Sequence, residues 1–269
     1  MFSLAHLTFA PLAPPEAIRL AARLGYGAVG LRALPAAAGG AFSPLVADAA
    51  LRRETRAAIE ATGVGVLDME IVRLGAGFTI ETVRPFLAVS AELGARAVLV
   101  AGDDPDRGRL VASFATLAEA AASFGLTADL EFMPWTAVPD ARTALAVVEA
   151  AGASNGGVLV DALHFARSET SLDDVAAIPR ERLHYAQFCD APAEIPATVE
   201  GLIHDARHRR LLPGDGGIDL AGLVARLPAD LPIGLELPNE TAKAELGVEA
   251  WAARAIERAR RLFVLSGSA

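Results

Sequence analysis

Eight short apolar runs alternate with helix-forming segments along the 269 residues of the chain. Most of these runs are rich in Val, Ile and Leu, as expected of parallel strands that are buried on both faces. The predicted strands are 2–8, 28–32, 64–71, 97–101, 128–133, 158–161, 183–188 and 233–237. The predicted helices are 14–25, 47–61, 79–93, 104–125, 138–151, 168–178, 220–227 and 248–265. This repeat predicts a parallel α/β fold.

Two parallel α/β architectures fit eight such repeats: the closed barrel and the open doubly wound sheet. A (β/α)8 barrel typically needs about 250 residues, which is close to the length of this chain. The doubly wound fold usually places a glycine-rich turn after its first strand, and Thr8-Phe9-Ala10-Pro11 is unlike that turn. No linker or low-complexity break interrupts the repeats. We therefore predict an α/β fold with a single (β/α)8 TIM barrel, one domain over residues 1–269.

The composition argues against several classes of protein. A net charge of −9 and a pI near 5.1 argue against a nucleic-acid partner, because such proteins usually carry a basic face. The single cysteine, Cys189, excludes an internal disulfide and is typical of a reducing compartment. Residues 1–7 are apolar but lack the basic start of a signal peptide, and no run is long enough to cross a bilayer. We expect a soluble, cytoplasmic protein with no membrane partner.

Four oxygen ligands lie at the ends of predicted strands five to eight: Glu131, Asp161, Gln187 and Glu236. The carboxyl ends of barrel strands share one mouth, where barrel active sites are built, so these side chains should converge. Three converging carboxylates repel one another unless a cation holds them. Oxygen ligands favour one divalent ion, with Mn²⁺ or Mg²⁺ first and Zn²⁺ or Co²⁺ as alternatives. A structural hydrogen-bond network is the other interpretation.

Two histidines and a glutamate are further candidates at this mouth. His164 follows Asp161 by three residues and suits substrate binding or proton transfer beside a metal. Glu70 lies near the end of strand three, and His6 lies near the end of strand one. We expect Glu70 and His6 to contact the substrate, although His6 could equally fill the mouth without a ligand.

Two cations are candidates for binding an anionic substrate. Arg210 precedes the tight turn 213–216, and there it could lie over an anionic or hydroxyl-rich ligand. Lys243 is the only lysine of the chain and follows the last strand. It could bind a phosphate or carboxylate, and a solvated loop lysine is the alternative.

These residues resemble the xylose-isomerase-like TIM-barrel superfamily, which includes ketose 3-epimerases, inosose dehydratases, bacterial 3-dehydroshikimate dehydratases and endonuclease IV. The resemblance rests on Glu131, the Asp161-to-His164 spacing, the run 187–190, the loop 210–216 and Glu236. It implies that Glu131, Asp161, Gln187 and Glu236 are the metal ligands.

The chain departs from this family pattern at two positions. The family usually has histidine where this chain has Gln187, and glutamine followed by Cys189-Asp190-Ala191-Pro192 is more similar to the bacterial 3-dehydroshikimate dehydratases. Those enzymes carry basic residues on strand three, where this chain has Asp68-Met69-Glu70. The nuclease branch uses additional histidines on the early strands, and the strand ends here offer none.

The resemblance implies a metal-dependent isomerase or epimerase acting on a keto-sugar, a sugar phosphate or a cyclic polyol. The metal would chelate a carbonyl and a neighbouring hydroxyl and stabilise an enediolate, with Glu131 and Glu236 as base and acid. Expelling a β-hydroxyl from the same intermediate would instead make the enzyme a dehydratase, a carbon–oxygen lyase. A carbohydrate-binding barrel without turnover is the third alternative. The expected partner is a polyhydroxylated small molecule, and a homo-oligomer is compatible with the sequence.

Overall fold

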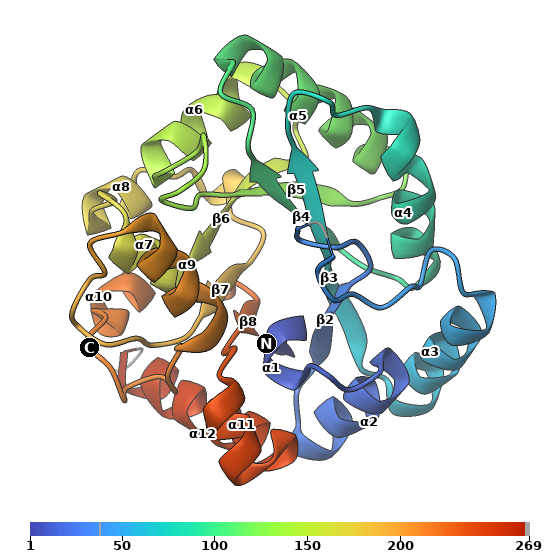
Figure 1. Cartoon of the computed structure of the whole chain (residues 1–269), viewed down its shortest axis with the longest axis vertical. Coiled ribbons are helices and arrows are strands. Elements are labelled where there is room, and N and C mark those ends of the chain that lie inside the picture. The colour runs from blue at the N-terminus through green and yellow to red at the C-terminus, as the bar shows by residue number, and fades with distance from the viewer. Residues whose placement is uncertain (38, 267–269) are drawn as a thin grey trace.

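Eight parallel strands close into a barrel in the computed structural model, which describes residues 1–37 and 39–266 (Figure 1). Each strand pairs with its neighbours in chain order, and the last strand pairs with the first. The strands are β1 (Phe2–Leu4), β2 (Ala28–Arg32), β3 (Gly65–Leu74), β4 (Ala97–Gly102), β5 (Thr127–Glu131), β6 (Gly156–Asp161), β7 (Ala186–Phe188) and β8 (Ile233–Leu235). The predicted (β/α)8 barrel is confirmed.

Helices surround the barrel and connect successive strands (Figure 1). The helices that match the predicted ones are α2 (Pro14–Leu24), α3 (Ala49–Thr62), α4 (Ile80–Glu92), α5 (Arg107–Ala122), α6 (Ala141–Ala151), α8 (Leu172–Ala176), α10 (Leu220–Val224) and α12 (Val248–Ser266). Local chemistry sets their ends. Asp48, Asp106 and Asp140 accept backbone N–H bonds at the starts of α3, α5 and α6. Gly25 and Gly63 end α2 and α3 in the left-handed conformation.

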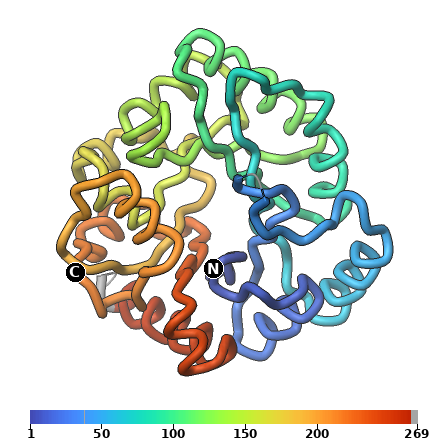
Figure 2. Tube along the Cα trace, in the orientation of Figure 1, coloured from blue at the N-terminus to red at the C-terminus, as the bar shows by residue number. Residues whose placement is uncertain are grey.

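Further short helices follow strand ends, where loops form the mouth of a barrel. They are α1 (His6–Phe9), α7 (Ala162–Arg167), α9 (Val199–His208) and α11 (Glu240–Leu246), and a 3₁₀ turn covers Arg180–Arg182. The chain passes once around the barrel, so the C-terminal segment lies beside the N-terminal one (Figure 2).

The structure corrects four details of the prediction. Strand β1 ends at Leu4, so His6 lies on the short helix α1 and not on a strand. Strand β3 runs on to Leu74, three residues beyond the prediction, and therefore carries Arg73. The long segment 189–217, between predicted strand seven and the next predicted helix, contains helix α9. Lys243 lies in helix α11 and not in a loop.

Apolar side chains fill both layers of the barrel. A large cluster joins the outer faces of the strands to the helices, and a smaller cluster fills the inside. The inner cluster comprises Ala28, Leu67, Ile71, Ala97, Leu99, Ala101, Met133, Leu159 and Tyr185. It draws mainly on β2 to β4, so the polar side chains at the ends of β5 to β8 lie on the other side of the barrel from most of this cluster. No helix in the part of the chain that the structure describes is long and apolar enough to cross a membrane.

Candidate active site

The four predicted metal ligands lie at the ends of four adjacent strands. Glu131 ends β5, Asp161 ends β6, Gln187 lies in β7 and Glu236 directly follows β8. Asp161 and Gln187 are partners in the strand register, and Gln187 is also the partner of Gly234. All four side chains are buried, with Asp161 and Gln187 fully so. The strand register of a closed barrel therefore places these oxygen ligands at one end of neighbouring strands.

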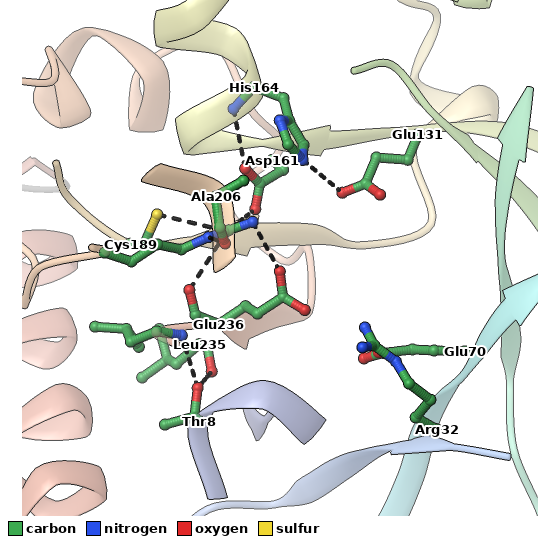
Figure 3. A network of polar contacts seen from close by, with 12 residues as sticks. Thr8, Arg32, Glu70, Glu131, Asp161, His164, Cys189, Ala206, Leu235 and Glu236 are labelled. Carbon is green, nitrogen blue, oxygen red and sulfur yellow. Dashed lines mark hydrogen bonds and ion pairs between the residues drawn. The ribbon is translucent and has the colours of Figure 1, made fainter. Parts of the chain in front are cut away.

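His164 joins two of these carboxylates in a buried group. Glu131, Asp161 and His164 each offer a ligand atom, and these atoms lie within 4.8 Å of one another. His164 Nε2 is 3.6 Å from Glu131 Oε1 (Figure 3). Because Asp161 begins helix α7, its Oδ1 also accepts the backbone N–H of His164 at 3.0 Å. A buried group of this composition can bind a divalent metal ion.

Gln187 supplies an independent test of whether a metal fits this site. Both atoms of its side-chain amide are buried and have no hydrogen-bond partner in the protein. An unpartnered buried polar group costs about 1–3 kcal/mol, so a ligand or water that binds this amide removes a penalty. Gly234 packs beside it, because a Cβ there would lie 3.2 Å from Gln187 Cγ. An amide oxygen beside Asp161 fits a hard divalent ion.

Arg210 lies among the predicted ligands and not out over a substrate. Its guanidinium is buried, with Nη1 2.6 Å from Asp161 Oδ2 and Nη2 3.0 Å from Glu236 Oε2. Its Nε donates to the Ala206 carbonyl at the end of α9. Arg210 therefore contacts the cavity while it neutralises two carboxylates, which corrects the expected position of a free substrate anchor.

The turn at 213–216, expected to place Arg210, has a structural role. The Asp190 carboxylate accepts the backbone N–H groups of Gly214, Gly216 and Ile218 at 2.9, 3.0 and 3.1 Å. A Cβ at Gly216 would collide with the Ala191 carbonyl and the Asp190 carboxylate, so only glycine fits there. Asp190 thus fixes the loop that carries Arg210 back to the barrel.

Burial and neighbouring charges set the protonation of the group. Burial first, then the charges of Asp161 and Glu236, raise the pKa of Glu131 well above its usual range. Burial likewise raises the pKa of Glu236 to about 7, against the opposing effect of Arg210. Burial would raise the pKa of Asp161 too, but Arg210 and His164 hold it below the usual value. Burial lowers the pKa of His164 to about 4, so its imidazole is neutral at pH 7.

A cavity of about 340 Å³ opens over these residues at the barrel mouth. Its polar lining includes His6, Arg32, Arg73, Glu131, His164, Arg210 and Glu236. Its apolar lining includes Leu7, Ile71, Leu99, Met133 and Trp135. The Trp135 ring packs edge to face on His164, with 5.1 Å between ring centroids. The cavity therefore offers polar groups that can bind hydroxyl and carbonyl groups, and apolar groups that can contact carbon–hydrogen surface.

The sequence reasoning missed three of these lining residues. Arg73 was missed because β3 is longer than its apolar run, and Arg32 because no motif around it marks it as a cavity residue. Trp135 follows Glu131 by four residues, so its place in the chain was the one available signal. Arg32 binds Glu70 Oε2 through Nε at 3.0 Å and Nη2 at 2.7 Å, and Arg73 binds Asp103 through two bonds of 2.6 Å.

Of the two predicted substrate contacts, Glu70 and His6, only His6 lines the cavity. Glu70 is fully buried behind Arg32 and does not line the cavity, although its Oε1 has no partner in the protein. His6 lines the cavity from helix α1, and its Nδ1 is also without a partner. Burial lowers the pKa of His6 to about 4, so it faces the cavity as a neutral imidazole.

Lys243 is engaged in holding helix α1. Its Nζ donates to the carbonyls of Leu7 and Ala10 at 3.1 and 2.9 Å, at the C-terminal end of that helix. A cation there satisfies carbonyls that have no partner within the helix. The side chain is half-buried and does not line the cavity. This position differs from the expected substrate anchor.

Replacing Lys243 with methionine should therefore lower the free energy of unfolding by about 1 kcal/mol, because two charge-assisted hydrogen bonds at a half-exposed site are lost. The KM for an anionic substrate should change little. Chemical denaturation and steady-state kinetics measure the two effects, with Glu245→Gln on the same helix as a control. A KM raised many-fold with unchanged stability would restore the anchor role.

Comparisons with known proteins agree with this architecture. A family model described as xylose isomerase-like TIM barrel matches residues 18–262. A 3-dehydroshikimate dehydratase of Pseudomonas aeruginosa is 33% identical over 128 residues, which are 46% of this chain and 20% of that protein. The match thus spans about a fifth of the length of that relative.

Two solved structures show the same fold. The IolI protein with a bound zinc atom has a TM-score of 0.81 at 15% identity, over 98% of each chain. An L-ribulose 3-epimerase has a TM-score of 0.73 at 16% identity, over 99% of this chain and 95% of that one. At these identities the likeness concerns the fold alone.

Proposed function

The chain belongs to the xylose isomerase-like TIM-barrel family, and on that premise we propose that it is a divalent-metal-dependent isomerase or epimerase of a polyhydroxylated ketone. One observation carries the proposal. Glu131 and His164 of the buried group line a cavity that Glu236 also lines, and Arg210 lies between Asp161 and Glu236. Carboxylates from β5 and from the end of β8 can then reach a bound carbon atom from different directions.

Glu131, Asp161, Gln187 and Glu236 would hold the metal ion, Mn²⁺ or Mg²⁺ before Zn²⁺ or Co²⁺. Arg210 binds one oxygen of Asp161 and one of Glu236, so each carboxylate keeps a second oxygen. A bound ion would polarise the carbonyl oxygen of the substrate and stabilise negative charge that develops on it.

The side chains of the chain itself supply the proton transfers. Glu131 lines the cavity beside His164, and its carboxylate can take the proton from the carbon next to the carbonyl. Glu236 can return a proton from its own side of the cavity, which inverts the carbon centre. Neutral His164 can donate to or accept from a substrate hydroxyl while Trp135 holds its ring in place.

Exchange with deuterated water tests the proposal. The protein, loaded with Mn²⁺, is incubated in D₂O with a panel of ketoses, ketose phosphates and inososes. We expect at least one substrate to exchange a carbon-bound hydrogen next to its carbonyl. NMR measures this exchange. A panel member that binds without any exchange would support a binding protein and contradict the enzyme.

A dehydratase is the second candidate, and specific observations favour it. The relative that is 33% identical over 46% of this chain is named a 3-dehydroshikimate dehydratase. Gln187 stands where the family usually has histidine, and Arg73 on β3 lines the cavity, so strand three does carry a basic residue. A product assay with 3-dehydroshikimate in the panel separates the two reactions. A conjugated, ultraviolet-absorbing product identifies the lyase, whereas an isobaric product with a changed stereocentre identifies the isomerase.

A further inference from the structure

Two exposed histidines lie one turn apart on helix α9, outside the barrel site. His204 and His208 are four residues apart, a spacing that puts two side chains on the same face of a helix. Their ring centroids are 5.2 Å apart, with 46° between the ring planes. Imidazole nitrogens are the commonest protein ligands of Zn²⁺ and related ions, and each binds at about 2.0–2.1 Å. A pair at this separation can bind one ion between its rings after a small rotation of either side chain.

A carboxylate already orients one of these rings. Glu240 Oε2, on helix α11, lies 3.0 Å from His208 Nδ1. A carboxylate on one ring nitrogen fixes the tautomer, and it leaves Nε2 free to bind a metal ion. Glu200 lies one turn before His204 on the same helix and adds a negative charge near the pair. The arrangement therefore contains two ligands and the hydrogen-bond acceptor that metal-binding histidines usually have.

We propose that His204 and His208 form a second metal site on α9 for Zn²⁺ or a similar borderline divalent ion, with Glu240 as the residue that orients His208. The site is separate from the buried group of Glu131, Asp161 and His164. His208 and Glu240 line the rim of the cavity, whereas His204 does not line it. An ion bound here joins α9 to α11 through the His208–Glu240 contact, and so holds one side of the cavity rim.

Counting bound ions tests this site independently of the barrel site. Full-length protein, stripped of metal with a chelator and dialysed, is titrated with Zn²⁺ in a calorimeter. The unmodified protein should bind one more ion than the His204→Gln variant, whether or not the barrel site takes Zn²⁺. His208→Gln should lose the same ion. Glu240→Gln should keep the ion with an affinity about tenfold weaker, the smaller effect of a residue that orients a ligand.

Two controls guard against a trivial result. Glu54→Gln removes an exposed carboxylate on α3, far from any histidine pair in the sequence, and should bind Zn²⁺ like the unmodified protein. Circular dichroism checks that each variant is folded, which is expected because His204 and His208 are exposed. Equal stoichiometry and affinity in His204→Gln and the unmodified protein would overturn the proposal. If the barrel site binds no Zn²⁺, the unmodified protein and the His204→Gln variant each bind one ion fewer. The difference of one ion between the two proteins is then unchanged.

Discussion

Replacing Glu131 with glutamine should lower kcat by about 10²–10⁴-fold, the range expected for loss of a general base. Glutamine keeps the shape and one oxygen ligand of the side chain, but it cannot take a proton. The Glu131 carboxylate is buried and lines the cavity beside His164, which makes it the candidate base. Steady-state kinetics and hydrogen exchange in D₂O, both at saturating Mn²⁺, measure the effect.

Saturating metal separates the two roles that Glu131 could have. If Glu131 serves only as a ligand, excess Mn²⁺ should restore most of the activity of the variant. If it is also the base, the loss of kcat should persist when metal analysis shows a full site. Glu149→Gln on helix α6 is a matched control outside the cavity and should behave like the unmodified enzyme. A variant of Glu131 with unchanged kcat would contradict the proposed mechanism.

The barrel could be predicted because its signal is local and repeated. Most buried strands are short apolar runs, and several helices between them have their own start and stop residues, such as Asp48 and Gly63 around α3. The convergence of Asp161 and Gln187 followed from the fold itself, since the ends of parallel strands in a barrel meet at one mouth. Those parts of the site depended on strand position alone.

Contacts between distant residues could not be predicted in the same way. Arg210 and Asp161 are 49 positions apart, and their ion pair depends on the path of the loop that Asp190 holds. Lys243 and Leu7 are 236 positions apart, so no local sequence pattern indicates their contact. The continuation of β3 to Arg73 was hidden because the register shifts between Met69 and Val72, which breaks the alternation on which strand prediction relies.

Replacing Arg210 with methionine should destabilise the metal-free protein by about 3–5 kcal/mol. The guanidinium is buried and is the partner of two buried carboxylates, Asp161 at 2.6 Å and Glu236 at 3.0 Å. Methionine fills part of the same space but leaves both carboxylates without that positive charge. Chemical denaturation in the presence of a chelator measures the loss. Arg23→Met, which breaks an exposed pair with Glu249, should cost less than about 1 kcal/mol and serves as the control.

The same variant links stability to metal binding. A divalent ion held by Glu131, Asp161 and Glu236 supplies positive charge where Arg210 supplies it in the metal-free protein. The difference in unfolding free energy between the Arg210→Met variant and the unmodified protein should therefore shrink when Mn²⁺ is added. Comparing these differences with and without the ion removes the general stabilisation that any bound ligand gives. A difference that stays the same with Mn²⁺ would mean that the ion and Arg210 act on separate groups, and the metal site as drawn would then be wrong.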